Sequence, residues 1–241
     1  MYSLIEMLFC FSKNFFMKKI TLPLAALLIL AACDNKPSQE KTENAKPDST
    51  QNATAITNPN VTEWMSWEAG VDVAAVTDTS FKTPNVIVHV ARMVNTPVGN
   101  AASGMILYQP DAKQQPIAMG FVSTNKTVGA YFGPKIFAGT PFEKAPVLDA
   151  TITIKQDNKT ATAKVVTGGH VFEVEMTDLG KPYLIDRKPS AMPPFYQQGV
   201  EMNAGTVKLK VDGKEVKLIL PPKGISGGPA AVVSPNGVYA R

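Results

Sequence analysis

The chain has 241 residues, with 24 Lys and Arg against 20 Asp and Glu, two His and two Cys. Three of the Lys and one of the Glu precede residue 33, so the rest of the chain has a net charge near +2. A nucleic-acid-binding surface needs basic residues gathered on one face. No such cluster is present, and we expect no nucleic-acid partner. No Cys follows Cys33, which excludes disulfides, thiolate metal sites and iron–sulfur chemistry beyond that point.

The segment from Met17 to residue 32 is organised like a secretory signal. Met17 is followed by two Lys, an almost wholly apolar run over 20–30, and small residues at the end. The run is shorter than the roughly 20 residues that a membrane-spanning helix needs. We therefore expect Met17 to be the true start, residues 1–16 to be an over-extended reading frame, and residues 1–32 to be removed as a signal peptide.

The four residues 30–33, Leu-Ala-Ala-Cys, resemble the lipobox of bacterial lipoproteins. The resemblance implies that the Cys33 thiol takes a diacylglycerol, that the signal is cut before Cys33, and that the new amine is acylated. Several acyl chains make attachment to a bilayer effectively permanent. Asp34 follows directly, as in enteric lipoproteins that stay in the inner membrane. The resemblance thus implies a lipid-anchored protein that faces the periplasm, with the inner membrane favoured and the outer membrane as the alternative.

Residues 33–60 predict a linker and residues 61–241 a single folded domain. From Asp34 to residue 60 the composition is polar and Pro-containing with one large aliphatic residue, Ile56, so it cannot bury enough apolar surface to offset its ordering entropy. As a flexible coil this linker reaches roughly 30 Å. The remaining stretch is long enough for one core of ordinary size.

Short runs of Val, Ile and Thr broken by Gly, Pro and Asn recur after residue 61, without an apolar period of helical length. The fold predicted is all-β, an antiparallel β-sandwich or barrel-like domain. The strands expected first are those of a meander, 150–155, 160–167 and 170–177. Further strands are expected over 86–94, 105–108, 117–123, 128–132 and 230–233.

Turn residues set the expected register of three hairpins. A turn on Asp157-Asn158 would pair Ile154 with Ala161 and Ile152 with Ala163. A turn on Gly168-Gly169 would pair Val165 with Phe172, Ala163 with Val174, and Lys164 with Glu173. A turn on Asp212-Gly213 would pair Leu209 with Val216, Val207 with Leu218, and Lys210 with Glu215.

Two aromatic segments are candidate binding surfaces. Trp64 and Trp67 could form a stacking platform for a glycan or an apolar ligand, or pack into one end of the core. The loop predicted from residue 186 to Tyr196 is rich in charges, Pro and aromatics, and long ordered loops on sheet scaffolds often carry recognition. From this loop we select Arg187, Phe195 and Tyr196.

Catalytic and metal chemistry have one weak candidate each. The string Gly-Ile-Ser-Gly-Gly-Pro at 224–229 resembles the nucleophile motif of chymotrypsin-like serine proteases, with Ser226 as nucleophile and His89 as base. It departs from that family in Ile225, in the setting of His89, and in a C-terminal remainder too short for a second barrel. A metal site on His89 and His170 would need a carboxylate such as Asp72 or Asp78. We expect neither a catalytic site, nor a metal, nor a cofactor.

The sequence thus indicates a membrane-anchored envelope lipoprotein with a non-catalytic β-domain that binds a protein partner. The alternative is a small-ligand or glycan binding module. A serine hydrolase that uses Ser226 is the remote alternative.

Overall fold

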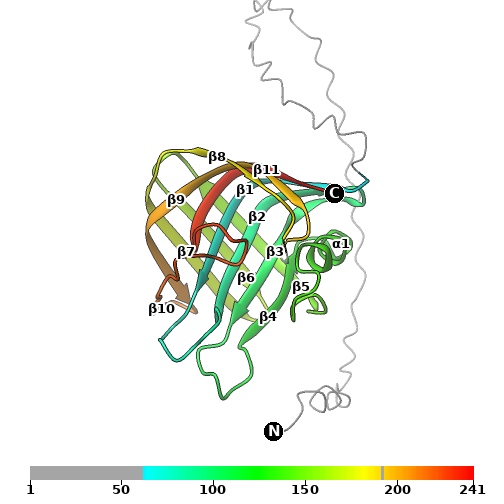
Figure 1. Cartoon of the computed structure of the whole chain (residues 1–241). Helices are drawn as coiled ribbons and strands as arrows, with labels where there is room; N and C mark the ends of the chain where they lie inside the picture. Colours follow the sequence, from blue (N-terminus) through cyan, green and yellow to red (C-terminus); the bar gives the residue numbers. More distant parts are fainter. Residues whose placement is uncertain (1–61, 191–192) are drawn as a thin grey trace, which may run out of the picture. The chain divides into compact units, whose positions relative to one another are not determined.

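The computed structural model describes residues 62–190 and 193–241 (Figure 1). The predicted signal peptide, Cys33, Asp34 and the linker to residue 60 lie outside the described residues. The described elements are β1 (Trp64–Ala75), β2 (Val86–Thr96), β3 (Gly99–Tyr108), β4 (Ala118–Ser123), α1 (Lys126–Ile136), β5 (Val147–Gln156), β6 (Ala161–Thr167), β7 (His170–Leu179), β8 (Tyr183–Arg187), β9 (Tyr196–Val211), β10 (Lys214–Val216) and β11 (Ala231–Ala240).

The fold is all-β, as predicted, and its strands form one sheet that closes on itself. The strands pair in the order β11, β1, β2, β3, β4, β5, β6, β7. β9 pairs with β11 through its first half and with β7 through its second half, so the sheet returns to its start. Strands therefore wrap around a common interior (Figure 1). Of the two predicted architectures, the structure has the barrel-like one.

The expected strand over 128–132 is wrong, because these residues lie in α1. β4 and β5 pair in parallel, whereas the sequence predicts antiparallel neighbours, and a parallel pair needs a crossover connection between its strands. α1 supplies that crossover. Asn125 caps it, since its side-chain oxygen accepts hydrogen bonds from the backbone N–H groups of Thr127 and Val128.

In two of the three predicted hairpins, the residues that pair have the predicted partners. About Gly168-Gly169, Val165 pairs with Phe172 and Lys164 with Glu173, with 3.2 Å between Nζ and Oε1 of that second pair. About Asp212-Gly213, Leu209 pairs with Val216 and Lys210 with Glu215. The predicted pair of Val207 and Leu218 is absent from the ladder because β10 ends at Val216.

The predicted register at Asp157 is wrong by two residues. Ile154 pairs with Ala163 and not with Ala161, because residues 157–160 all belong to the turn. The Asp157 carboxylate accepts hydrogen bonds from the backbone N–H groups of Lys159 and Thr160, which favours this longer turn. A shift of two residues leaves every side chain on its predicted face.

Each face of the sheet packs against its own hydrophobic core. The inner core fills the closed sheet with side chains such as Val71, Val88 and Val165. The outer core lies between the sheet and α1 with its neighbouring loops, and it includes Met65, Trp67, Met105, Phe121, Phe132, Phe137, Phe195 and Tyr239. The outer face of β1 to β4 is therefore covered, and its side chains are sequestered from solvent.

An irregularity at Ala69 in β1 marks where the two cores exchange sides along the strand. Ala69 has a positive φ of 51° and no partner in either neighbouring strand, whereas Glu68 and Gly70 on each side of it are paired. The register with β2 and β11 is the same before and after Ala69, so the alternation of side chains changes there without an extra residue. Trp67 and Asp72 consequently line the same cavity on the outer face although they are five positions apart.

Candidate functional site

The structure divides the five residues predicted as a binding surface between the two faces of the sheet. Trp64 and Tyr196 are 47% and 48% exposed. Trp67 and Phe195 are buried in the outer core, so the prediction that they contribute to an exposed surface is wrong. Arg187 lies on the covered side of β8 in a polar cluster. Trp64 and Trp67 cannot form a joint platform, because three positions along a strand place them on opposite faces.

Trp64 and Tyr196 lie in one row across three strands. Ala240 of β11 pairs with Trp64 of β1 on one side and with Tyr196 of β9 on the other. Paired residues project to the same face of a sheet, so both rings stand on the face that carries the inner core further along the strands, with Val71 of β1 and Met202 of β9, at an end of that face which is uncovered. Leu184 of β8 pairs with Val200 on the same face and is 85% exposed.

We call this surface the open face. Its polar members form contacts along the sheet: Asn95 Nδ2 donates to Ser66 Oγ at 3.2 Å, and Gln198 Nε2 donates to Asp186 Oδ1 at 3.4 Å. The open face comprises Trp64, Ser66, Glu68, Asn95, Leu184, Asp186, Tyr196, Gln198, Val200 and Asn236. It combines aromatic rings, an exposed aliphatic side chain, amides and two carboxylates.

β8 borders the open face and carries a free edge. Within residues 62–190 and 193–241, β8 pairs with β9 only. An edge strand presents backbone N–H and C=O groups that another extended chain can pair with. Five residues make this edge short, and it ends at Arg187, whose side chain turns to the covered side.

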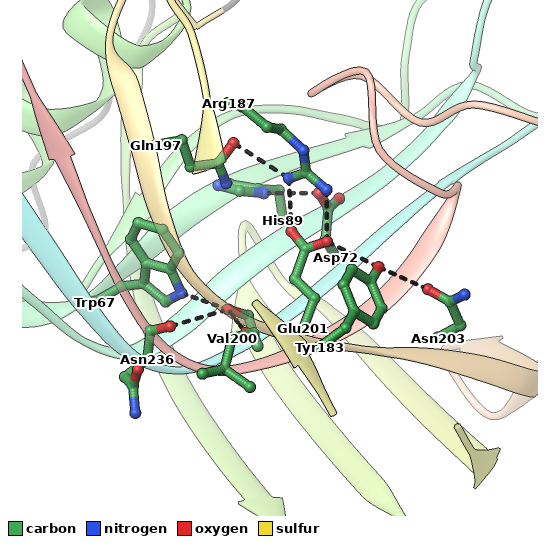
Figure 2. A network of polar contacts seen from close by, with 11 residues as sticks. Trp67, Asp72, His89, Tyr183, Arg187, Gln197, Val200, Glu201, Asn203 and Asn236 are labelled. Atoms are coloured by element: carbon green, nitrogen blue, oxygen red, sulfur yellow. Dashed lines mark hydrogen bonds and ion pairs between the residues drawn. The ribbon is translucent and has the colours of Figure 1, made fainter. Parts of the chain in front are cut away.

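Arg187 forms a bidentate ion pair with Glu201 (Figure 2). Nη1 and Nη2 of Arg187 donate to the two carboxylate oxygens of Glu201 at 2.7 and 2.6 Å, and Nη1 also contacts Gln197 Oε1 at 3.2 Å. Only 3% of the Glu201 side chain is exposed. Burial favours neutral Arg187, but its hydrogen bonds to the Glu201 carboxylate dominate and raise the pKa of Arg187 further. We call Arg187, Gln197, Glu201, Tyr183 and Asn203 the Arg187 cluster.

Tyr183, the first residue of β8, completes the Arg187 cluster. Its hydroxyl contacts Glu201 Oε2 at 3.1 Å and Asn203 Oδ1 at 2.8 Å. Burial, together with the negative charge of Glu201, raises the pKa of Tyr183 to about 12. The phenol therefore stays protonated and acts as a hydrogen-bond donor.

Beside the Arg187 cluster, His89 and Asp72 form a second charged pair (Figure 2). They are cross-strand partners on β2 and β1, with 3.3 Å between His89 Nδ1 and Asp72 Oδ2. Burial opposes a charge on the imidazole, but the Asp72 carboxylate and, less strongly, Glu201 raise the pKa of His89. The other carboxylate oxygen, Asp72 Oδ1, is buried without a hydrogen-bond partner among the described residues.

A cavity of about 30 Å³ lies between these groups and the outer core. Its lining includes Asp72, His89, Glu201, Gln197 and Tyr239. This volume accommodates water, and Asp72 Oδ1 is a polar group that a water molecule could satisfy. The site is thus a small polar chamber under a hydrophobic cover.

The turn over 224–229 closes part of this cover. Gly228 lies so close to Arg187 that a Cβ on Gly228 would meet Nη2 at 2.4 Å, which explains why this position is glycine. Ser226 lines a second cavity, of about 10 Å³, together with His89, Phe137 and Tyr239. The structure therefore brings Ser226 and His89 together, as the remote alternative requires, although on a single closed sheet and not on two barrels.

The other histidine lies elsewhere. His170 Nδ1 is 2.8 Å from Asp212 Oδ2 at an exposed hairpin end. Asp78 binds Ser80 in an exposed loop. No group of three or more His, Cys, Asp or Glu side chains in the described part of the chain is arranged to hold a metal ion.

Sequence reasoning missed the Arg187 cluster and the pairing of His89 with Asp72. Glu201 and Gln197 fall in a stretch that was not predicted as strand, although the alternation from 197 to 201 places both on one face. Asp72 was named only as an alternative metal ligand. A carboxylate within a strand rich in Val and Ala was the available signal, because a buried acid requires a partner.

The chain matches no protein-family model, no curated protein and no solved structure. Among the residues that the structure describes, no helix is both long enough and apolar enough to cross a membrane.

The stability of the protein should depend on the charge of His89. Its folded-state pKa is raised above the unfolded value near 6.5, so its stabilising contribution is complete below that pH and is lost as the pH rises through the folded pKa. We expect the free energy of unfolding, measured in urea, to fall as the pH is raised above about 6.5. His89→Gln should abolish this fall, and His170→Gln should keep it. An equal pH dependence in wild type and His89→Gln would contradict the prediction.

Removal of the Arg187 guanidinium should be strongly destabilising. Arg187→Met leaves the Glu201 carboxylate buried and unpaired, which typically costs about 3–5 kcal/mol. The double variant Arg187→Met/Glu201→Gln should regain most of this loss, because no buried charge remains. Urea unfolding of both variants tests this coupling, and a loss below about 1 kcal/mol in the single variant would show that solvent or another group compensates Glu201.

Proposed function

We propose that the protein is a lipid-anchored lipoprotein of the bacterial cell envelope whose β-domain binds a protein partner through the open face. The observation that carries this proposal is the exposure of Trp64, Tyr196 and Leu184 on one uncovered sheet face. Trp and Tyr are the side chains that contribute most often to binding hot spots. The inner and outer cores together bury most of the other large apolar side chains, so these three are available to a partner.

The free edge of β8 favours a partner that presents an extended segment. Such a segment would pair with the backbone of β8, and alternate side chains would then lie over Leu184 and Tyr196. Backbone pairing supplies affinity in this mode, and the aromatic rings supply selectivity. The open face contains no His or Cys, which supports a binding role for this surface and not a catalytic one.

The lipobox-like residues support the anchor, and Asp34 favours the inner membrane. Thr62 and Glu63 N–H groups both donate to the Arg241 carbonyl, so the predicted linker joins the domain beside Trp64. A tether of roughly 30 Å would let the open face reach partners close to the bilayer.

Lipidation of Cys33 should determine where the protein is found. We expect wild-type protein to incorporate an alkyne analogue of palmitate in bacterial cells and to fractionate with membranes facing the periplasm. Cys33→Ala should lose both the label and the membrane association, because a thiol is required for the first acylation. Cys10→Ala is the matched control and should behave as wild type. Labelling that persists in Cys33→Ala would refute the anchor.

Partner binding should depend on the open face. We expect a photo-reactive residue introduced at Ser66 to cross-link one envelope protein, whereas the same residue at Thr153, an exposed position of β5 outside the open face, should not. Once that partner is purified, Trp64→Ala and Tyr196→Ala should each weaken binding at least tenfold, measured by calorimetry. Leu220→Ala, an exposed aliphatic change outside the open face, should leave it unaltered.

A glycan ligand is the second candidate, because Asn95, Gln198 and Asn236 place amides beside the aromatic rings. In that case envelope oligosaccharides should quench the fluorescence of Trp64, and Trp64→Phe should abolish the response while buried Trp67 remains as an internal reference. Quenching by a glycan without any cross-linked protein would replace the protein-partner proposal by this one. If neither quenching nor a cross-linked protein is observed, both binding proposals are refuted.

A further inference from the structure

The covered face carries a set of groups that the proposed binding function does not use. His89 and Ser226 line the same cavity of about 10 Å³, although they are 137 positions apart in the chain. Ser226 lies in a tight turn, in which the Gly224 N–H donates to the Gly228 carbonyl at 2.8 Å and Gly227 has a φ of 77°. This turn places a hydroxyl on the same cavity as the half-buried imidazole.

Asp72 lies beside that imidazole. His89 Nδ1 is at ion-pair distance from Asp72 Oδ2, 3.3 Å, without a hydrogen bond, and the opposite ring nitrogen, Nε2, is left for another partner. Neither His89 Nε2 nor the Ser226 hydroxyl makes a hydrogen bond within the described residues. The acid, the imidazole and the hydroxyl thus come from β1, β2 and the turn over 224–229, and they lie in the spatial order in which serine hydrolases use them.

We propose that Asp72, His89 and Ser226 form a catalytic triad that hydrolyses short-chain carboxylic esters. Ser226 Oγ attacks the ester carbonyl carbon while His89 Nε2 takes its proton, and the C–O bond to the alcohol breaks as His89 returns that proton to the leaving oxygen. Water then attacks the acyl carbon while His89 takes its proton, and the bond to Ser226 Oγ breaks as His89 returns that proton to Oγ, which releases the carboxylic acid and restores Ser226. Asp72 holds the imidazole and stabilises its charge throughout.

The surroundings of Ser226 select the substrate class. Ile136, Phe137, Ile225 and Tyr239 make the cavity apolar and narrow, so an acetyl group suits it better than a long acyl chain. The backbone N–H groups of Ser226 and Gly228 make no hydrogen bond among the described residues, which leaves them available to a developing oxyanion. Without substrate, Ser226 and His89 are not hydrogen-bonded, and such contacts commonly tighten only when substrate binds.

The test uses the purified full-length protein and two probes. A fluorophosphonate should label the protein, and peptide mass spectrometry should place the adduct on Ser226. p-Nitrophenyl acetate should be hydrolysed faster than p-nitrophenyl octanoate, with a rate that rises as the pH passes the pKa of His89. Ser226→Ala should abolish labelling and lower acetate hydrolysis at least 100-fold, whereas Ser80→Ala, in an exposed loop, should change neither.

The fluorophosphonate adduct is measured on the wild-type protein. It therefore tests the triad even if the Ser226 or His89 variants lose stability. His89→Gln should also lose hydrolysis while its circular dichroism at the pH of the assay stays that of a β-sheet protein. Absence of labelling, an adduct on another residue, or equal hydrolysis by wild type and Ser226→Ala would overturn the triad. Leu220→Ala, an exposed change outside both the open face and the turn over 224–229, should keep full hydrolysis.

Discussion

The sixteen residues of β9 connect every functional feature of the domain. Backbone N–H and C=O groups inside a protein must be hydrogen-bonded, and a long sheet satisfies this requirement only if its two edges are paired or exposed. β9 pairs with β11 and β8 along its first half and with β7 and β10 along its second, and so closes the sheet. Closure creates an interior and an exterior, and β9 contributes side chains to both.

Alternation along β9 separates two different surfaces within a few residues. Tyr196 and Gln198 project to the open face, whereas Gln197 and Glu201 project to the covered face. The left-handed backbone at Ala69 accompanies the same division in β1, where Trp64 lies on the open face and Trp67 and Asp72 lie on the covered face. A single layer of sheet thereby carries the open face on one side and, on the other, a chamber where paired charges meet a mainly apolar lining.

The covered chamber contains charged side chains, and each of its carboxylates has a cationic partner. Two buried carboxylates, Asp72 and Glu201, would each be costly alone, and each has a cationic partner at ion-pair distance. Tyr183 and Gln197 satisfy further hydrogen-bonding positions on the second pair. Glycine at position 228 lets a loop backbone close over Arg187, so the chamber is sealed by a turn that also carries Ser226.

The sequence by itself determined the fold class, the hairpin about Gly168-Gly169 and the face taken by each meander residue, because a two-residue period and turn chemistry are local properties. It also suggested the exposed rings of Trp64 and Tyr196, but it could not separate them from buried Trp67 and Phe195. That separation depends on which face α1 covers, and α1 itself was predicted as a strand. The pairing of Asp72 with His89, and of Arg187 with Glu201, was decided by tertiary structure alone. Such contacts join residues whose spacing carries no periodic signal, and only the register of a closed sheet brings them within reach of one another.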